Sequence, residues 1–154
     1  MKIFSAFIVF SIFCLPATAQ DAGTLRKKHY NLESTIAIKG YDPVAYFTQN
    51  KAVKGKKEMA VSYQGIVYHF SSTENKALFK AAPFKYEPEY GGWCANAMGK
   101  NGEKVSVDPE TFKVLNGRLY LFYNRYFTNT LKDWNKNETN LKKNADINWP
   151  KLFK

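Results

Sequence analysis

The stretch 59–74, MAVSYQGIVYHFSSTE, carries the strongest local signals in the sequence and decides the predicted fold. Residues 59–70 are rich in β-branched and aromatic side chains on both sides of a Gln-Gly pair, which predicts a β-hairpin. Ser71 and Glu74 follow as a capping box, and they predict a helix that runs through Ala82. A hairpin that leads directly into a helix is therefore the centre of the predicted fold.

Signals on both sides extend this centre. Upstream, Asp42 can cap a short helix and Pro43 can open it, because Pro needs no N–H partner at the first helical position. Downstream, residues 88–98 predict a helix, although their Gly-Gly pair also fits a turn with a later helix start. Residues 104–107 and 112–124 predict further strands, the latter with an Asn-Gly hairpin turn.

The C-terminal part is predicted to be helical. Large apolar side chains recur there at helical spacing from Phe127 to Trp149, and the Asn-rich stretch 135–140 is a candidate break between two helices. Taken together, these signals predict an α+β fold. It consists of a small antiparallel sheet of hairpins packed against several helices, with a helical C-terminus.

Residues 1–19 predict a secretory signal peptide. A short positive start precedes an apolar run, and small residues lead to a cleavage site between Ala19 and Gln20. The alternative is an uncleaved anchor, which the shortness of the apolar run disfavours. We therefore expect an exported protein, periplasmic or secreted, without stable membrane insertion. Residues 20–35 are polar and basic without periodicity, and we expect a flexible lead-in to a domain over residues 36–154.

Composition narrows the classes of function. The chain has 154 residues, a formal net charge of +10, two Cys and two His. These counts exclude a four-cysteine zinc site and a three-histidine zinc centre. The basic residues are nearly all Lys and are spread along the chain, whereas nucleic-acid readers favour Arg. We therefore expect no nucleic-acid partner.

Three residues are candidates for chemistry, namely His69, Cys94 and Met98. Removal of the signal would leave Cys94 as the only cysteine, which is unusual for an exported protein. If residues 88–98 form one helix, Cys94 and Met98 lie four residues apart on one face. Thiolate, thioether and imidazole together suit Cu(I) or a blue-copper-like site. Alternatively, all three residues serve packing and hydrogen bonding, or Cys94 and His69 form a nucleophilic pair.

Several motifs together resemble the YHS-domain family. They are GYDPVAYF at 40–47, GIVYHFSS at 65–72, YGGWCA at 90–95 and LYLFYN at 119–124. The resemblance covers roughly residues 36–149 and is to the exported, single-domain branch of the family. YHS domains are similar to TRASH-type heavy-metal modules, so the resemblance implies metal sensing, trafficking or scavenging.

The sequence departs from the metal-binding relatives at the ligand positions. In those relatives a Cys follows Asp-Pro-Val and two more lie at the hairpin-to-helix junction, where this chain has Ala45, Ser71 and Asn75. The departure argues against structural zinc and leaves His69, Cys94 and Met98 as the available soft donors.

The first hypothesis is therefore a non-enzymatic protein that binds or traffics copper through His69 and Cys94, with Met98 as a weaker third ligand. The second is a non-metal interaction module in which Cys94 and His69 are structural. The third is a thiol enzyme with Cys94 as its nucleophile. A metal ion is the partner that the sequence indicates, and no protein partner can be named from it.

Overall fold

The structure is a computed structural model that describes residues 17–154. The predicted signal peptide, residues 1–19, lies almost wholly outside the described residues, so its cleavage stays a prediction. Between residues 17 and 154, no helix combines the length and the apolar character that a membrane span requires.

The elements follow one another along the chain in a mixed order. They are α1 (Ala17–His29), β1 (Leu32–Glu33), β2 (Ile36–Ala37), the 3-10 helix η1 (Ile38–Gly40), α2 (Ala45–Thr48), β3 (Lys56–Tyr63), β4 (Ile66–Phe70), α3 (Thr73–Ala81), α4 (Pro83–Tyr86), η2 (Glu89–Gly92), α5 (Ala95–Asn101), β5 (Asp108–Leu115), β6 (Arg118–Phe122), β7 (Asn124–Arg125), β8 (Thr128–Asn129), α6 (Thr130–Lys136), α7 (Glu138–Asn148) and η3 (Trp149–Phe153).

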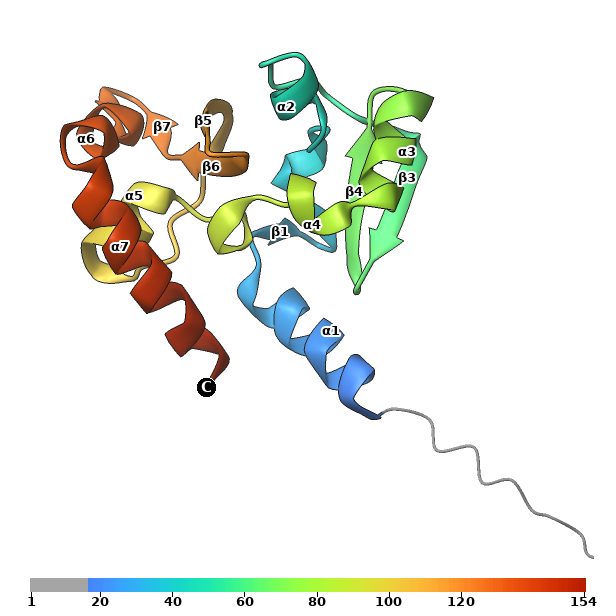
Figure 1. Cartoon of the computed structure of the whole chain (residues 1–154), viewed down its shortest axis with the longest axis horizontal. Coiled ribbons are helices and arrows are strands. Elements are labelled where there is room, and N and C mark those ends of the chain that lie inside the picture. The colour runs from blue at the N-terminus through green and yellow to red at the C-terminus, as the bar shows by residue number, and fades with distance from the viewer. Residues whose placement is uncertain (1–16) are drawn as a thin grey trace, which may run out of the picture.

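Figure 1 shows two groups of elements joined through α4 and η2. One group contains a four-stranded sheet of order β1-β2-β4-β3, with α3 beside it. The other contains the antiparallel hairpin β5–β6 with α5, α6 and α7. Small sheets packed with helices, and a helical C-terminus, confirm the predicted α+β class. The four-stranded sheet is mixed and not purely antiparallel as predicted, because β2 pairs parallel with β4.

The central hairpin forms as the sequence predicts. β3 and β4 pair antiparallel with Tyr63 opposite Ile66, and the Gln-Gly turn between them has positive φ at both residues. Side chains alternate between the two faces of a strand, and Ile66, Tyr68 and Phe70 of β4 are fully buried. Tyr68 and Phe70 pack on Phe79 of α3, with ring centroids 4.7 and 5.1 Å apart. The hairpin and the helix that follows it therefore share one core.

The single helix predicted for residues 88–98 is wrong. Tyr90 and Gly91 have φ values of 53° and 60°, so the chain turns in η2, and α5 begins only at Ala95. Glycine adopts positive φ without steric penalty, which explains the Gly-Gly pair. A Cβ on Gly91 would also lie 2.7 Å from the Trp149 ring. Cys94 is consequently the residue that precedes α5, not a residue inside a helix.

The C-terminal half follows the prediction with two exceptions. The β5–β6 hairpin turns at its Asn-Gly pair, and the predicted helical break falls at Asn137, between α6 and α7. Residues 104–107 form no regular strand. Phe127 does not join the helical stripe, because it is fully exposed in the turn between β7 and β8.

Residues 20–35 contain regular structure where the sequence predicts a flexible lead-in. They include most of α1 and all of β1. The Arg26 guanidinium pairs with Glu87 and lies 4.4 Å from the centre of the Tyr30 ring. Tyr68 of β4 donates to the same Glu87 carboxylate. Helix α1 is therefore fixed by the contact of Arg26 with Glu87, 61 residues away in the sequence. Local periodicity cannot reveal such a contact.

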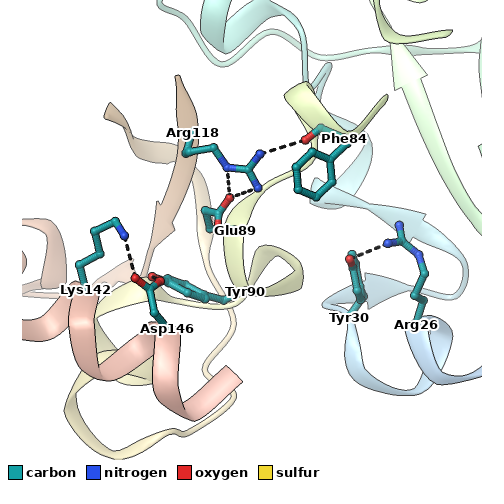
Figure 2. Close-up of polar contacts among 8 residues, drawn as sticks. All are labelled: Arg26, Tyr30, Phe84, Glu89, Tyr90, Arg118, Lys142 and Asp146. Carbon is teal, nitrogen blue, oxygen red and sulfur yellow. Dashed lines mark hydrogen bonds and ion pairs between the residues drawn. The ribbon is translucent and has the colours of Figure 1, made fainter. Parts of the chain in front are cut away.

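Polar contacts join η2 to the C-terminal group of elements (Figure 2). Arg118 of β6 pairs with Glu89 and also donates to the Phe84 carbonyl, at 3.2 Å. Tyr90 donates its hydroxyl to Asp146 of α7, at 2.9 Å. The segment between the two groups of elements is thus fixed by side chains from β6 and α7.

Helices α5 and α7 approach so closely that only glycine fits at their contact. A Cβ on Gly99 would lie 2.3 Å from the Leu141 carbonyl oxygen. Gly99→Ala should therefore lower the free energy of unfolding by about 1–3 kcal/mol, measured by urea denaturation. Gly23→Ala is the matched control, since its Cβ would lie 3.6 Å from the Gln64 carbonyl oxygen and alanine favours helix. Equal losses in both variants would contradict this packing.

Candidate functional site

The buried carboxylate of Asp42 is the most heavily hydrogen-bonded group of the YHS-like region. Asp42 is completely buried. Its Oδ1 accepts the Val44 N–H at 2.9 Å. Its Oδ2 accepts the Ser71 N–H at 2.8 Å, the Ser71 hydroxyl at 2.6 Å and the Asn75 side-chain amide at 2.7 Å. These bonds tie the loop before α2 to the junction between β4 and α3.

The junction differs in one detail from the predicted capping box. Ser72, not Ser71, caps α3, because the Ser72 hydroxyl accepts the Asn75 N–H at 3.1 Å. Ser71 is left free to donate both its N–H and its hydroxyl to Asp42. Ser72 therefore caps α3, and its neighbour Ser71 binds the Asp42 carboxylate.

Cys94 is fully buried, and its thiol is fully hydrogen-bonded. Its Sγ accepts the Tyr123 N–H at 3.4 Å and lies 3.4 Å from the Thr130 hydroxyl oxygen. The single hydroxyl proton of Thr130 is donated to the Tyr123 carbonyl, at 2.9 Å. The Cys94 S–H is therefore the donor to Thr130. In this arrangement the S–H donates one hydrogen bond and the sulfur accepts another.

Met98 does not share an environment with Cys94. Met98 is fully buried in a core cluster that contains Tyr120 and Trp134. Cys94 belongs to a different core cluster, which contains Tyr68 and Phe70 of β4. The two residues meet through the backbone, where the Met98 N–H donates to the Cys94 carbonyl at 3.0 Å. The common helix face predicted for their side chains does not form.

His69 lies on the other face of β4 from Cys94. Alternation along the strand turns His69 away from the face that carries Tyr68 and Phe70. It lines a cavity of about 230 Å³ with Lys39, Lys54 and Lys57.

The cavity beside Cys94 is a separate one. Cys94 lines a space of about 250 Å³ with Asn96, Glu103, Tyr123 and Thr130, among others. The two cavities have no lining residue in common. The structure therefore does not bring the predicted metal ligands together.

The donor set does not fit a soft-metal centre in this arrangement. Such a centre needs its sulfur and nitrogen donors to point at one position. Within residues 17–154, no group of three or more His, Cys, Asp or Glu side chains is placed to hold a metal ion. The three predicted ligands lie in different places. The His69 imidazole lines the lysine-rich cavity, and Cys94 and Met98 belong to two separate core clusters.

Comparison with known proteins identifies part of the chain. The family model of the YHS domain matches residues 44–90, so the chain carries a YHS domain over this segment. The predicted resemblance to that family is confirmed there. No curated protein and no solved structure matches the chain. His69, Ser71 and Asn75 lie inside the matched segment, whereas Cys94 and Met98 follow it.

The role of the Asp42 cluster is what sequence reasoning missed. The sequence nominated Asp42 only as a helix cap and Ser71 only as part of a capping box. One signal could have revealed more, because both residues that bind the carboxylate side chain, Ser71 and Asn75, are polar residues at the junction between the hairpin and the helix. Buried polar side chains need hydrogen-bond partners, and Asp42 accepts from both of these.

Removal of the Asp42 carboxylate should be strongly destabilising. Asp42→Ala leaves the Ser71 N–H and the Asn75 amide buried without an acceptor, and we expect a loss of about 3 kcal/mol in unfolding free energy. Asp108→Ala is the comparator, because Asp108 accepts the Glu110 N–H and the Thr111 hydroxyl in a more open position. It should lose only about 1 kcal/mol. Urea denaturation measures both, and equal losses would argue against a special role for Asp42.

The Cys94 thiol should be inert in the folded protein. Within residues 20–154, Cys94 is the only cysteine, so a thiol reagent applied to a protein of these residues reports on it alone. Because the side chain is buried and its S–H is donated, labelling at neutral pH should be slow and should become fast only in denaturant. Rapid stoichiometric labelling of the native protein would contradict this environment.

Proposed function

We propose that this protein is a non-enzymatic binding protein whose YHS domain works without a bound metal. The observation that carries the proposal is the hydrogen bonding of Ser71 and Asn75 to the buried Asp42 carboxylate. YHS domains resemble heavy-metal modules in which cysteines occupy these two positions. In this chain the side chains at these two positions donate hydrogen bonds to an internal carboxylate and do not present sulfur ligands to a metal ion.

The chemistry of the side chains at these positions supports a function without a bound metal. A hydroxyl and an amide that donate to a carboxylate do not offer the thiolate sulfur that soft metals prefer. The third family position is the small, fully buried Ala45, which has no donor atom in its side chain. The cluster is therefore suited to holding α2 against the β4–α3 junction.

Copper binding through His69, Cys94 and Met98 is the competing hypothesis. It requires His69 to cross from one face of β4 to the other, or Cys94 to leave the core cluster that it shares with Phe70. It also requires the thiol to give up its contacts with Thr130 and Tyr123. Rearrangement on that scale would disturb the packed core of the domain, so the geometry favours the metal-free function.

A thiol enzyme is supported less well. A nucleophilic cysteine needs a general base within hydrogen-bond reach. The groups that contact the Cys94 sulfur are a threonine hydroxyl and a backbone N–H, and neither accepts a proton readily at neutral pH. The pairing with His69 that would activate the thiol is opposed by their separate cavities.

Export to the periplasm or the exterior is part of the same proposal. Its support is the sequence of residues 1–19, with a basic start, an apolar run and small residues before the cleavage site. A lone buried thiol is compatible with an oxidising compartment, because burial protects it from disulfide exchange.

Metal retention tests the metal-free function directly. The processed protein is dialysed against Cu(I), Cu(II) or Zn²⁺ and then analysed for metal after desalting. We expect far less than one equivalent, and we expect Cys94→Ser and wild type to retain equal amounts. The paired test variant is His69→Gln, which should also leave retention unchanged.

One outcome would overturn the proposal. Retention of one equivalent of copper that both Cys94→Ser and His69→Gln abolish would establish the competing copper site. Circular dichroism of each variant is the control, because a loss of fold could remove a metal site indirectly.

A further inference from the structure

We propose that the cavity beside His69 binds a compact oxyanion of phosphate size, held by His69, Lys39, Lys54 and Lys57. The inference rests on the proposed metal-free binding function and names its ligand class. The ligand is either free phosphate or the phosphate group of a small monoester, since both present the same oxygens.

The cavity has the size and the charge for such a ligand. Its volume is about 230 Å³, below the range of about 300–1,000 Å³ that drug-sized ligands occupy. Three lysines line it against one acidic side chain, Glu33, which is exposed. A concave surface with an excess of positive charge concentrates anions.

The lysines are held in place but are not neutralised. The Lys39 ammonium donates to the Val107 carbonyl at 2.8 Å, and the Lys54 ammonium donates to the Lys39 carbonyl at 2.6 Å. Each ammonium has three N–H donors, so both keep donors for a ligand. Within the described part of the chain, neither these two nor Lys57 forms an ion pair with a carboxylate.

Two glycines bring the backbone close to His69. A Cβ on Gly40, where φ is +77°, would lie 3.1 Å from His69 Nδ1. A Cβ on Gly55 would lie 2.5 Å from the His69 carbonyl carbon. Gly55 also donates its N–H to the Gly40 carbonyl at 2.9 Å, which fixes the wall that both residues form. A side chain at Gly40 would crowd the imidazole, and one at Gly55 would clash with the His69 backbone.

His69 itself is the group that lacks a partner. Its exposed fraction is 7%, and neither ring nitrogen makes a hydrogen bond to any residue between 17 and 154. Among the described residues, only Arg26 Nε is a fully enclosed side-chain atom without a partner, so the His69 ring nitrogens remain accessible from the cavity that the imidazole lines. A ligand oxygen in the cavity that His69 lines would supply the missing hydrogen bond.

The charges around His69 predict how binding depends on pH. Burial lowers the pKa of His69, and Lys57 and Lys54 lower it further, while Glu58 opposes them. Lys39 and Glu33 also line the same space. An anion there favours the protonated imidazole, so binding should raise the pKa of His69. By linkage, affinity should increase as the pH falls through that pKa.

NMR titration of the two histidines tests the site. Inorganic phosphate should raise the pKa of His69 and leave that of His29 unchanged, because His29 Nδ1 already contacts the Lys104 ammonium at 3.1 Å. Sodium chloride at equal ionic strength is the control for general screening. Glycerol phosphate forms the second arm. A response to both ligands indicates that monoesters enter, and a response to phosphate alone indicates the free ion.

Calorimetry with charge-matched variants completes the test. Lys54→Gln/Lys57→Gln should weaken phosphate binding by roughly threefold or more, and Lys132→Gln/Lys143→Gln, with the same change in net charge, should not. Both pairs are exposed, so the fold should tolerate them. No His69 response to phosphate or glycerol phosphate, or equal weakening in both variants, would overturn the oxyanion site. The metal-free function fails separately, through copper retention that depends on Cys94 and His69.

Discussion

The carboxylate of Asp42 is the constraint on which the arrangement of the YHS domain depends. A buried charge is tolerated only where hydrogen bonds replace its lost hydration, and Val44, Ser71 and Asn75 provide those bonds. They fix the start of α2 against the end of β4. Once the end of β4 is fixed, the alternation of its side chains directs Tyr68 and Phe70 into the core and turns His69 to the opposite face.

The two faces of β4 have different surroundings. The core face carries the aromatic cluster, to which the hydrogen-bonded and fully buried Cys94 also belongs. The other face carries an imidazole without a hydrogen-bond partner in the described chain, beside lysines that keep free donors. The first surroundings suit structure and the second suit recognition of an anion. Under our proposals, the core face holds the fold together and ligand binding takes place on the face that carries His69.

The sequence predicts most of what is decided locally. Both hairpins follow from their turn pairs, and the helix after β4 follows from adjacent serines and Glu74. The partners of Asp42 lie 29 and 33 residues away, and the partner of Arg26 lies 61 residues away, so no local pattern reveals them. The geometry expected for the candidate site differs from the structure for a related reason. Its geometry assumed a continuous helix over 88–98, whereas Tyr90 and the following glycine turn the chain before α5.

The central claim is that hydrogen bonds to Asp42 replace a metal in this YHS domain. Anomalous X-ray diffraction at the copper edge, from crystals soaked in a copper salt, examines the ligand positions and the carboxylate in one experiment. The account predicts Ser71 and Asn75 within hydrogen-bond distance of Asp42 Oδ2, and no anomalous peak beside Cys94 or the Asp42 cluster. An ordered copper ion bound by Cys94 together with His69, or one that displaces the Ser71 and Asn75 hydrogen bonds, would contradict it.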